Sequence, residues 1–247
     1  MENARITMKL TNRLEYPESV VKAVRNDSYN KGDCDFSCTE LIGPARIRVL
    51  TKAFYDQLET DVDDELFKLY GQIGHGLIER AGDSLTHVVE KRLFGEINGT
   101  RISAQIDSLS LVDGVLTDWK FTTVYGFKSG TPPKPEWVAQ LNIQLELLRM
   151  NGMDASKLQI CGILRDWRPA ESKREKGYPN KIGIHAIPMW TRAQATAFIV
   201  ARIKAHTEAF KTLPQCTPDE HWGGNRCAGY CAVSKHCDQY KQSKEAT

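Results

Sequence analysis

The spacing of apolar residues along the chain predicts first a helix and then a group of strands. From 61 to 80, apolar residues recur at intervals of three and four behind an acid-rich first turn, which is typical of an amphipathic helix. Gly82 follows at the position where a helix C-cap belongs. We expect the apolar stripe to face the core; it consists of Val62, Leu66, Leu69, Ile73 and Leu77.

Three short segments rich in β-branched residues come next, at 87–96, 100–112 and 115–123. They are separated by Asn98-Gly99 and Asp113-Gly114, residue pairs that favour two-residue hairpin turns. The pattern therefore predicts three consecutive antiparallel strands.

Capping residues and prolines mark the remaining elements. A capping box at Ser37 and Glu40 predicts a short helix that ends before Pro44. A helix should follow the proline-rich loop at 132–135 and end near Met150, and two further strands are expected at 158–167 and 182–189. A second capping box, at Thr191 and Gln194, predicts a long helix that ends at about Leu213 before Pro214.

This order of elements predicts an α/β fold with a mixed sheet flanked by helices. Residues 1–36 are polar and predicted to be irregular, residues 37–213 should form the catalytic domain, and residues 214–247 form a cysteine-rich tail.

Composition narrows the class of protein. Hydrophobic residues make up 41% and charged residues 26% of the 247, and no apolar run approaches the roughly 18 residues of a membrane helix, so we expect a soluble protein with no membrane partner. The first 15 residues lack the apolar stretch of a secretory signal, which favours the cytoplasm.

A formal charge of +2 gives no global attraction to polyanions, so any attraction must come from local basic clusters. Two clusters are candidates, and for the second, ordinary solvated surface charge is the simpler interpretation. They are Arg46/Arg48/Lys52 and Lys173/Arg174/Lys176/Lys181.

The second hairpin gathers charged residues among leucines. A two-residue turn at Asp113-Gly114 would pair Val112 with Val115 and place Asp107 opposite Lys120. Because side chains alternate, Asp107, Asp118 and Lys120 should share one face. Burying carboxylates is costly without compensation, so this arrangement indicates either a metal site or an Asp107–Lys120 salt bridge.

The segments Ile106-Asp107 and Asp118-Trp119-Lys120 resemble the signature of the PD-(D/E)XK nuclease superfamily. Further features are similar to the RecB-like branch, namely a Gly-x-x-Gly-His helix before the sheet, an acidic residue on the first strand and a glutamine-bearing helix after it. These residues are Gly71, Gly74, His75, Glu90, Gln140 and Gln144. The resemblance implies a restriction-endonuclease-like fold. It departs from the branch at Gln144, where a tyrosine is usual.

The resemblance also implies roles for these residues. His75, Asp107, Asp118 and the carbonyl of Trp119 would bind Mg²⁺ or Mn²⁺, and imidazole suits Mn²⁺ better. Lys120 would activate water and Glu90 would assist, although an exposed strand edge would also explain Glu90. Gln140 and Gln144 would contact the substrate.

The implied activity is that of a DNA exonuclease or end-processing nuclease in recombination, repair or phage DNA metabolism. A helicase or a single-strand annealing protein would be a possible partner. Two alternatives are an inactive DNA-binding module, against which the intact Asp107, Asp118 and Lys120 argue, and a restriction-type endonuclease, which seldom has the His75 helix.

Four of the seven cysteines lie in the tail, at Cys216, Cys227, Cys231 and Cys237. Structural zinc usually uses a C-x2-C pair, which is absent here, whereas related RecB-type nucleases, including those of CRISPR adaptation, hold a 4Fe-4S cluster through C-terminal cysteines and a distant one. The tail resembles those and predicts such a cluster, with zinc as the alternative. Cys34 or Cys38 could supply a distant ligand instead, and Cys161 is expected in the core.

Overall fold

The computed structural model describes residues 9–26, 30–81 and 85–245, and the chain divides into two compact units. The first unit comprises Met1–Asn30, Gly43–Leu69 and Ala201–Thr247, and the second comprises Lys31–Ile42 and Tyr70–Val200. Segments 43–69 and 201–213, which the sequence assigned to the catalytic domain, thus belong to the first unit. Gly82, the predicted C-cap, lies outside the described residues.

The first unit is built from short elements, and part of it corrects the prediction of an irregular N-terminus. Strand β1 (Lys9–Thr11) pairs in parallel with β3 (Glu59–Asp61), and helix α1 covers Glu18–Arg25. The β1 pairing depends on a distant carboxylate, because Asp61 accepts hydrogen bonds from the Thr11 hydroxyl at 2.6 Å and the Arg13 amide at 3.0 Å. Local sequence carries no signal for such a partner. The other elements are α3 (Ala45–Ala53), η1 (Tyr55–Gln57), α8 (Pro218–His221), η3 (Trp222–Gly224), α9 (Asn225–Gly229), η4 (Ser234–His236) and α10 (Asp238–Glu245).

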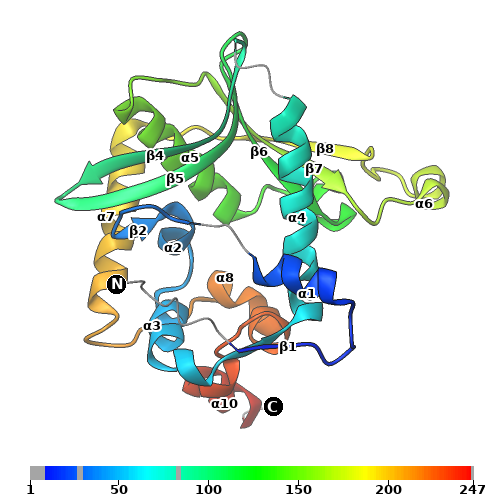
Figure 1. The fold of residues 1–247 in the computed structure, drawn as a ribbon. Coiled ribbons are helices and arrows are strands. Elements are labelled where there is room, and N and C mark those ends of the chain that lie inside the picture. Colours follow the sequence, from blue (N-terminus) through cyan, green and yellow to red (C-terminus); the bar gives the residue numbers. More distant parts are fainter. Residues whose placement is uncertain (1–8, 27–29, 82–84, 246–247) are drawn as a thin grey trace. The chain divides into compact units, whose positions relative to one another are not determined.

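The second unit contains a mixed sheet of six strands (Figure 1). Its strands are β2 (Phe36–Ser37), β4 (His87–Ile97), β5 (Thr100–Ser110), β6 (Val115–Thr122), β7 (Lys157–Leu164) and β8 (Ile182–Ile187). The order is β2-β5-β6-β7-β8, with β4 on the other side of β5. The β4–β5, β5–β6 and β7–β8 pairs are antiparallel, while β2–β5 and β6–β7 are parallel. The predicted α/β class with three antiparallel strands is confirmed.

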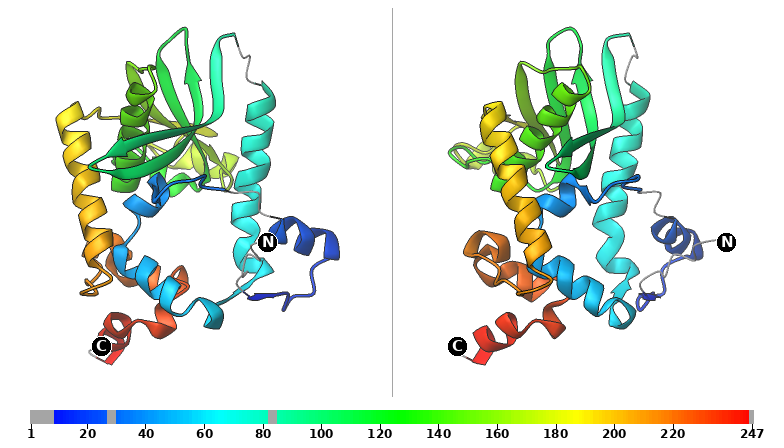
Figure 2. Two further views of the ribbon diagram at one scale, coloured as in Figure 1. Left: turned by 60° about the vertical axis from the view of Figure 1, so that its left-hand side comes forward. Right: turned by 90° about the vertical axis from the view of Figure 1, so that its left-hand side faces the viewer.

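Helices flank this sheet. Helix α5 (Pro135–Met150) is largely buried and runs along the sheet (Figure 2). Lys120 on β6 contacts Gln140 of α5, and the next residue, Phe121, contacts Gly74 of α4 (Val62–Ala81). Because consecutive residues of a strand point to opposite faces of the sheet, residues 70–81 of α4 lie on the opposite face from α5. The remaining elements in or entering this unit are α2 (Cys38–Ile42), η2 (Val124–Phe127), α6 (Pro169–Arg174) and α7 (Arg192–Glu208).

Both predicted capping boxes are present. In α2, the amide of Ser37 donates to Glu40 at 2.8 Å and the amide of Glu40 donates back to the Ser37 hydroxyl. Thr191 and Gln194 form the same pair before α7. In the described parts of the chain, no helix combines the length and the apolar character that crossing a bilayer requires.

The two predicted hairpin turns have different outcomes. Asn98 and Gly99 both have positive φ, and Ile97 pairs with Thr100, which is the two-residue turn expected. At the second hairpin, however, Ser110 pairs with Val115, so the loop has four residues and the predicted Val112–Val115 pairing is wrong. Ser110 explains the difference, because its hydroxyl bonds to both the amide and the carboxylate of Asp113 and closes the loop earlier.

The apolar stripe of α4 is also placed differently from the prediction. Val62 is buried, but Ile73 is 54% and Leu77 61% exposed. Gly74 occupies the contact with the sheet instead, because a Cβ there would lie 1.7 Å from the Phe121 ring. The small residue permits the close approach, and His75, next to it, becomes half-buried.

Candidate active site

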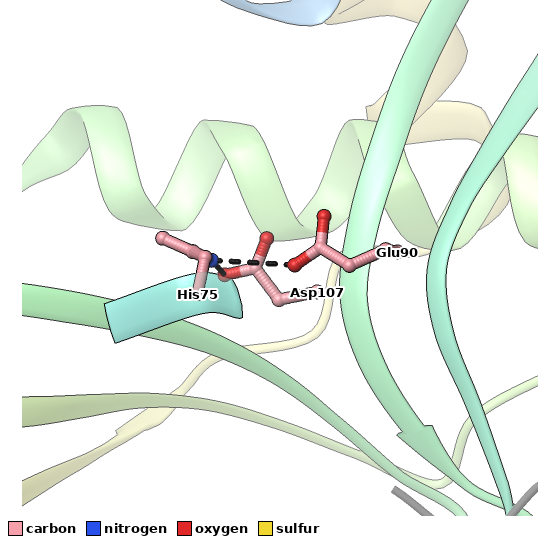
Figure 3. A group of neighbouring side chains, drawn as sticks. All are labelled: His75, Glu90 and Asp107. Carbon is pink, nitrogen blue, oxygen red and sulfur yellow. Dashed lines mark ion pairs between the residues drawn. The ribbon is translucent and has the colours of Figure 1, made fainter. Parts of the chain in front are cut away.

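Three side chains from three different elements of the second unit converge on one point. His75 comes from α4, Glu90 from β4 and Asp107 from β5 (Figure 3). One ligand atom from each lies within 4.8 Å of the other two, and the group is half-buried. His75 Nδ1 is 3.4 Å from the Glu90 carboxylate and 3.6 Å from that of Asp107. One imidazole nitrogen and two carboxylate oxygens at this separation can share a divalent cation.

Asp107 reaches this position because the β5–β6 ladder ends beside it. The last paired residues are Ser108 and Thr117, so one further step would place Asp107 opposite Asp118. Beyond the last pair, the Trp119 amide donates a hydrogen bond to the Asp107 carboxylate at 2.7 Å and not to a backbone carbonyl of β5. The register differs by two residues from the predicted one, and a shift of two keeps every side chain on its face. The prediction that Asp107, Asp118 and Lys120 share one face therefore survives the register error.

Glu90 has an unusual backbone at the same point. Its φ is +46°, in the left-handed region that a glutamate rarely adopts. Val89 pairs with Ser108 and Lys91 with Ile106, so Glu90 interrupts the β4–β5 ladder opposite Asp107. Strain of this kind is commonly retained where a side chain must be aimed at a site.

A chain of hydrogen bonds holds the Glu90 carboxylate. Gln105 Nε2 donates to Glu90 at 2.5 Å, and Arg92 donates to the side-chain oxygen Oε1 of Gln105 at 2.5 Å. Gln105 therefore fixes one oxygen of Glu90 while the other faces His75. Sequence reasoning missed this residue, and only its alternation with Asp107 along one strand could have pointed to it.

Asp118 and Lys120 form a second group beside the first. The Lys120 ammonium is 2.6 Å from the Asp118 carboxylate, whose side chain is 1% exposed. Gln140 bridges both, because its Nε2 donates to Asp118 at 2.5 Å and its Oε1 accepts from Lys120 at 3.3 Å. The structure thus brings Glu90, rather than Asp118, into the group with His75 and Asp107.

The electrostatics follow from burial of these charges. Burial raises the pKa of Asp107 to about 7, and the negative charge of Asp118 acts in the same direction. The hydrogen bond to Glu90 raises the pKa of His75, against the effect of burial. For Lys120, burial favours the neutral amine, but the charge and hydrogen bond of Asp118 outweigh it and the pKa is raised. Lys120 is therefore a cation at neutral pH.

The two residues predicted to contact the substrate, Gln140 and Gln144, have different surroundings. Gln140 binds the Asp118–Lys120 pair, as described above. Gln144 is buried and donates to the backbone carbonyl of Gln105 at 2.9 Å, so it supports strand β5 and lies away from an exposed surface. For Trp119 the structure shows the amide contact with Asp107, and its carbonyl as a ligand stays a prediction.

The cysteines occupy two environments. Within the second unit, Cys34 donates to Ser103, Cys38 is buried against the Gln140 carbonyl, and Cys161 is a core residue as predicted. Within the first unit, the four tail sulfurs line one small cavity together with Arg46 and Arg226. Arg46 Nε lies 3.1 Å from Cys237 Sγ. The tail cysteines are Cys216, Cys227, Cys231 and Cys237.

Comparisons with known proteins bear on the fold. No protein-family model matches the chain, and no curated protein sequence matches it. The crystal structure of SSO0001 is similar over 90% of this chain and 94% of that chain, with 17% identity and a TM-score of 0.56. A protein from Eubacterium rectale named Putative exonuclease matches over 59% of this chain and 57% of that chain, with 15% identity and a TM-score of 0.35. The first likeness shows a shared fold, and the second is too loose to carry an argument.

Proposed function

We propose that this protein is a divalent-metal-dependent nuclease that hydrolyses phosphodiester bonds in DNA. The observation that carries the proposal is the His75, Glu90 and Asp107 group, in which three ligand atoms lie within 4.8 Å of one another. The second supporting feature is the half-buried Lys120 cation beside it, which pairs with the buried Asp118 carboxylate. The residues that resemble the PD-(D/E)XK signature thus stand in the same part of the sheet.

The donor set fits the proposed cation. Imidazole with two carboxylates suits Mn²⁺, and the carboxylates alone suit Mg²⁺. When bound, such an ion would supply Lewis-acid stabilisation of the phosphate and a more acidic water. His75, Glu90 and Asp107 would hold it, and their half-burial would limit competition from solvent.

Lys120 would act on the substrate itself. Its ammonium group offers a compact positive charge that offsets charge developing on the phosphate and orients the attacking water. Asp118 keeps this lysine charged, and Gln140 fixes the pair. We therefore assign Asp118 the task of holding Lys120, which replaces the metal-ligand role that the resemblance implied.

The test is incubation of end-labelled linear and circular DNA with Mg²⁺, Mn²⁺ or EDTA. Cleavage is expected with either metal and not with EDTA. Lys120→Ala and Asp118→Ala should each reduce the rate at least about 100-fold, on the scale of a lost charge-stabilising group. Lys157→Ala, at the exposed start of β7, is the matched control. Full activity of either site variant would contradict the proposal.

The comparison of linear with circular DNA also tests whether cleavage requires a free DNA end. Preference for ends would support an exonuclease or end-processing enzyme in DNA recombination, repair or phage DNA metabolism. Stimulation by a helicase or a single-strand annealing protein would support the partner that the resemblance implies.

We further propose a 4Fe-4S cluster in the cysteine tail. The four thiols share one cavity, yet no three of their sulfurs, all of which the structure describes, lie within 4.8 Å of one another. The tail resembles those of nucleases that hold a 4Fe-4S cluster, and the C-x2-C pair usual for structural zinc is absent. Arg46 would stabilise a thiolate at Cys237.

Anaerobically purified protein should be brown, absorb at about 400 nm and contain iron with acid-labile sulfide. Colourless protein with one zinc per chain would support zinc and contradict the cluster.

A further inference from the structure

A projecting loop between β7 and β8 concentrates positive charge, and it begins beside the strand that carries Lys120. This loop, residues 165–181, is called the basic arm here; it carries six basic and three acidic residues and contains α6 (Figure 1). Most of its residues are exposed.

The acidic residues of the basic arm are all engaged. Asp166 accepts the Val124 amide at 2.8 Å, Glu171 pairs with Arg168 at 3.3 Å, and Glu175 pairs with Lys128 at 2.7 Å. By contrast, Lys173, Arg174 and Lys176 have no ion-pair partner within the described parts of the chain, although all three are exposed. Three neighbouring cations repel one another, and a polyanion would relieve that repulsion.

The basic arm is an ordered structure. Trp167 Nε1 donates to the Pro179 carbonyl at 2.9 Å, which ties its two limbs together. The Ser129 amide donates to the Gly177 carbonyl at 2.9 Å and attaches the arm to the loop after η2. Gly177 is required there, because its φ is +84° and a Cβ would lie 2.8 Å from the Ser129 side chain. The cations are therefore presented at a fixed place.

That place is set by the strand that carries Lys120. Thr122 of β6 pairs with Leu164 of β7, and the Arg165 amide donates to the Thr122 carbonyl at 3.0 Å. Lys120 precedes Thr122 by two residues, about 7 Å along the strand, or roughly two base-pair rises of duplex DNA. The basic arm thus begins immediately beyond Lys120, where the parallel strands β6 and β7 both end.

An exposed aromatic ring stands at the base of the arm. Tyr125 in η2 is 77% exposed and follows Val124, whose amide binds Asp166 of the arm. Exposed aromatic rings between cations are typical of surfaces that bind single-stranded nucleic acid, because bases stack on the ring while phosphates meet the cations.

We propose that the basic arm and Tyr125 bind the DNA strand beyond the cleaved bond. Lys173, Arg174 and Lys176 would contact its phosphates, and Tyr125 would stack with a base near the site. This inference rests on the proposed nuclease function for its choice of DNA as the polyanion. It is tested by binding, so its outcome is separate from that of cleavage.

The experiment measures binding of a fluorescein-labelled single strand of about 30 nucleotides to the full chain in EDTA, as a function of KCl. The triple variant K173A/R174A/K176A should bind at least about tenfold more weakly than wild type at low salt. Its slope of log affinity against log salt should fall by about 2, since each neutralised phosphate contributes about 0.7 for single strands. The control variant K157A/K204A/K211A loses the same charge at exposed sites elsewhere and should retain most of the slope.

Tyr125→Leu distinguishes stacking from charge. It should weaken binding several-fold with an unchanged salt slope, because it removes a ring and no cation. Equal affinity and slope for the arm and control variants would overturn the proposal, as would retention of wild-type protein by acidic vesicles but not by DNA. If the arm variant loses DNA binding while wild-type protein fails to cleave DNA with Mn²⁺, the arm proposal stands and the nuclease proposal falls.

Discussion

Asp107 is held where its ionised form is unfavourable unless a cation is present, and this gives a prediction about stability. Its side chain is 11% exposed, and burial with the nearby charge of Asp118 raises its pKa to about 7. In the unfolded chain the ordinary value is about 3.9. Between these two values the folded state holds a proton that the unfolded state has lost, so stability falls as the pH rises through this window.

Asp107→Asn removes this cost and keeps an acceptor for the Trp119 amide, which now donates to the carboxylate at 2.7 Å. At about 1.4 kcal/mol per pH unit, the variant should be more stable than wild type in EDTA at pH 8 by about 2 to 4 kcal/mol, with His75 nearby reducing the full effect. For a chain of this size, that corresponds to a rise in Tm of roughly 4 to 16 °C. At pH 5 the gain should be less than half as large.

The assay is thermal unfolding of both proteins, followed by circular dichroism in EDTA at pH 5 and pH 8, with a third series in Mn²⁺. Mn²⁺ should raise the Tm of wild type and leave that of the variant unchanged, because a bound ligand stabilises only the state that binds it. A variant no more stable than wild type at pH 8, or equally stabilised at both pH values, would refute the reasoning.

Two further predictions follow from contacts around the site. Gly74→Ala should destabilise the fold by about 1 to 3 kcal/mol in urea unfolding, because the new Cβ meets the Phe121 ring, whereas Gly76→Ala in the same helix has open space and should be neutral or stabilising. If both alanines behave alike, the packing of α4 on β6 is not as described. Gln105→Leu should weaken Mn²⁺ binding about 10- to 100-fold by releasing the Glu90 carboxylate, measured by calorimetry, with Gln159→Leu on β7 as the control. Unchanged affinity would show that Glu90 needs no such support.

Elements governed by local signals were predictable from the sequence. The Asn98-Gly99 turn and the two capping boxes formed as expected, because each depends on residues at most three positions apart. The three antiparallel strands β4, β5 and β6 that follow α4 were predicted as well.

Features that depend on distant partners were not predictable. Ile73 and Leu77 are exposed because Gly74, between them, is the residue that contacts Phe121, 47 positions further along the chain. The spacing of apolar residues cannot reveal such a contact. The strand β1 needs Asp61 in the same way.

The sequence predicted which residues belong to the candidate site, but it did not predict how they are grouped. His75, Glu90 and Asp107 were all named, but the division into a three-ligand group and a separate Asp118–Lys120 pair depends on where the β5–β6 ladder ends. The register of that ladder is set by the loop that Ser110 closes, and the resemblance to a motif gives no information on it.

The most direct test of the central claim is a parallel Mn²⁺ titration of binding and DNA cleavage in wild type and His75→Ala. If His75 helps to hold the catalytic cation, the variant should need at least about ten times more Mn²⁺ for half-saturation in both curves, with cleavage recovering at high Mn²⁺. His87→Ala, which removes a half-buried histidine from the start of β4, should leave both curves unchanged. A His75→Ala protein whose binding and cleavage curves coincide with those of wild type would contradict the account.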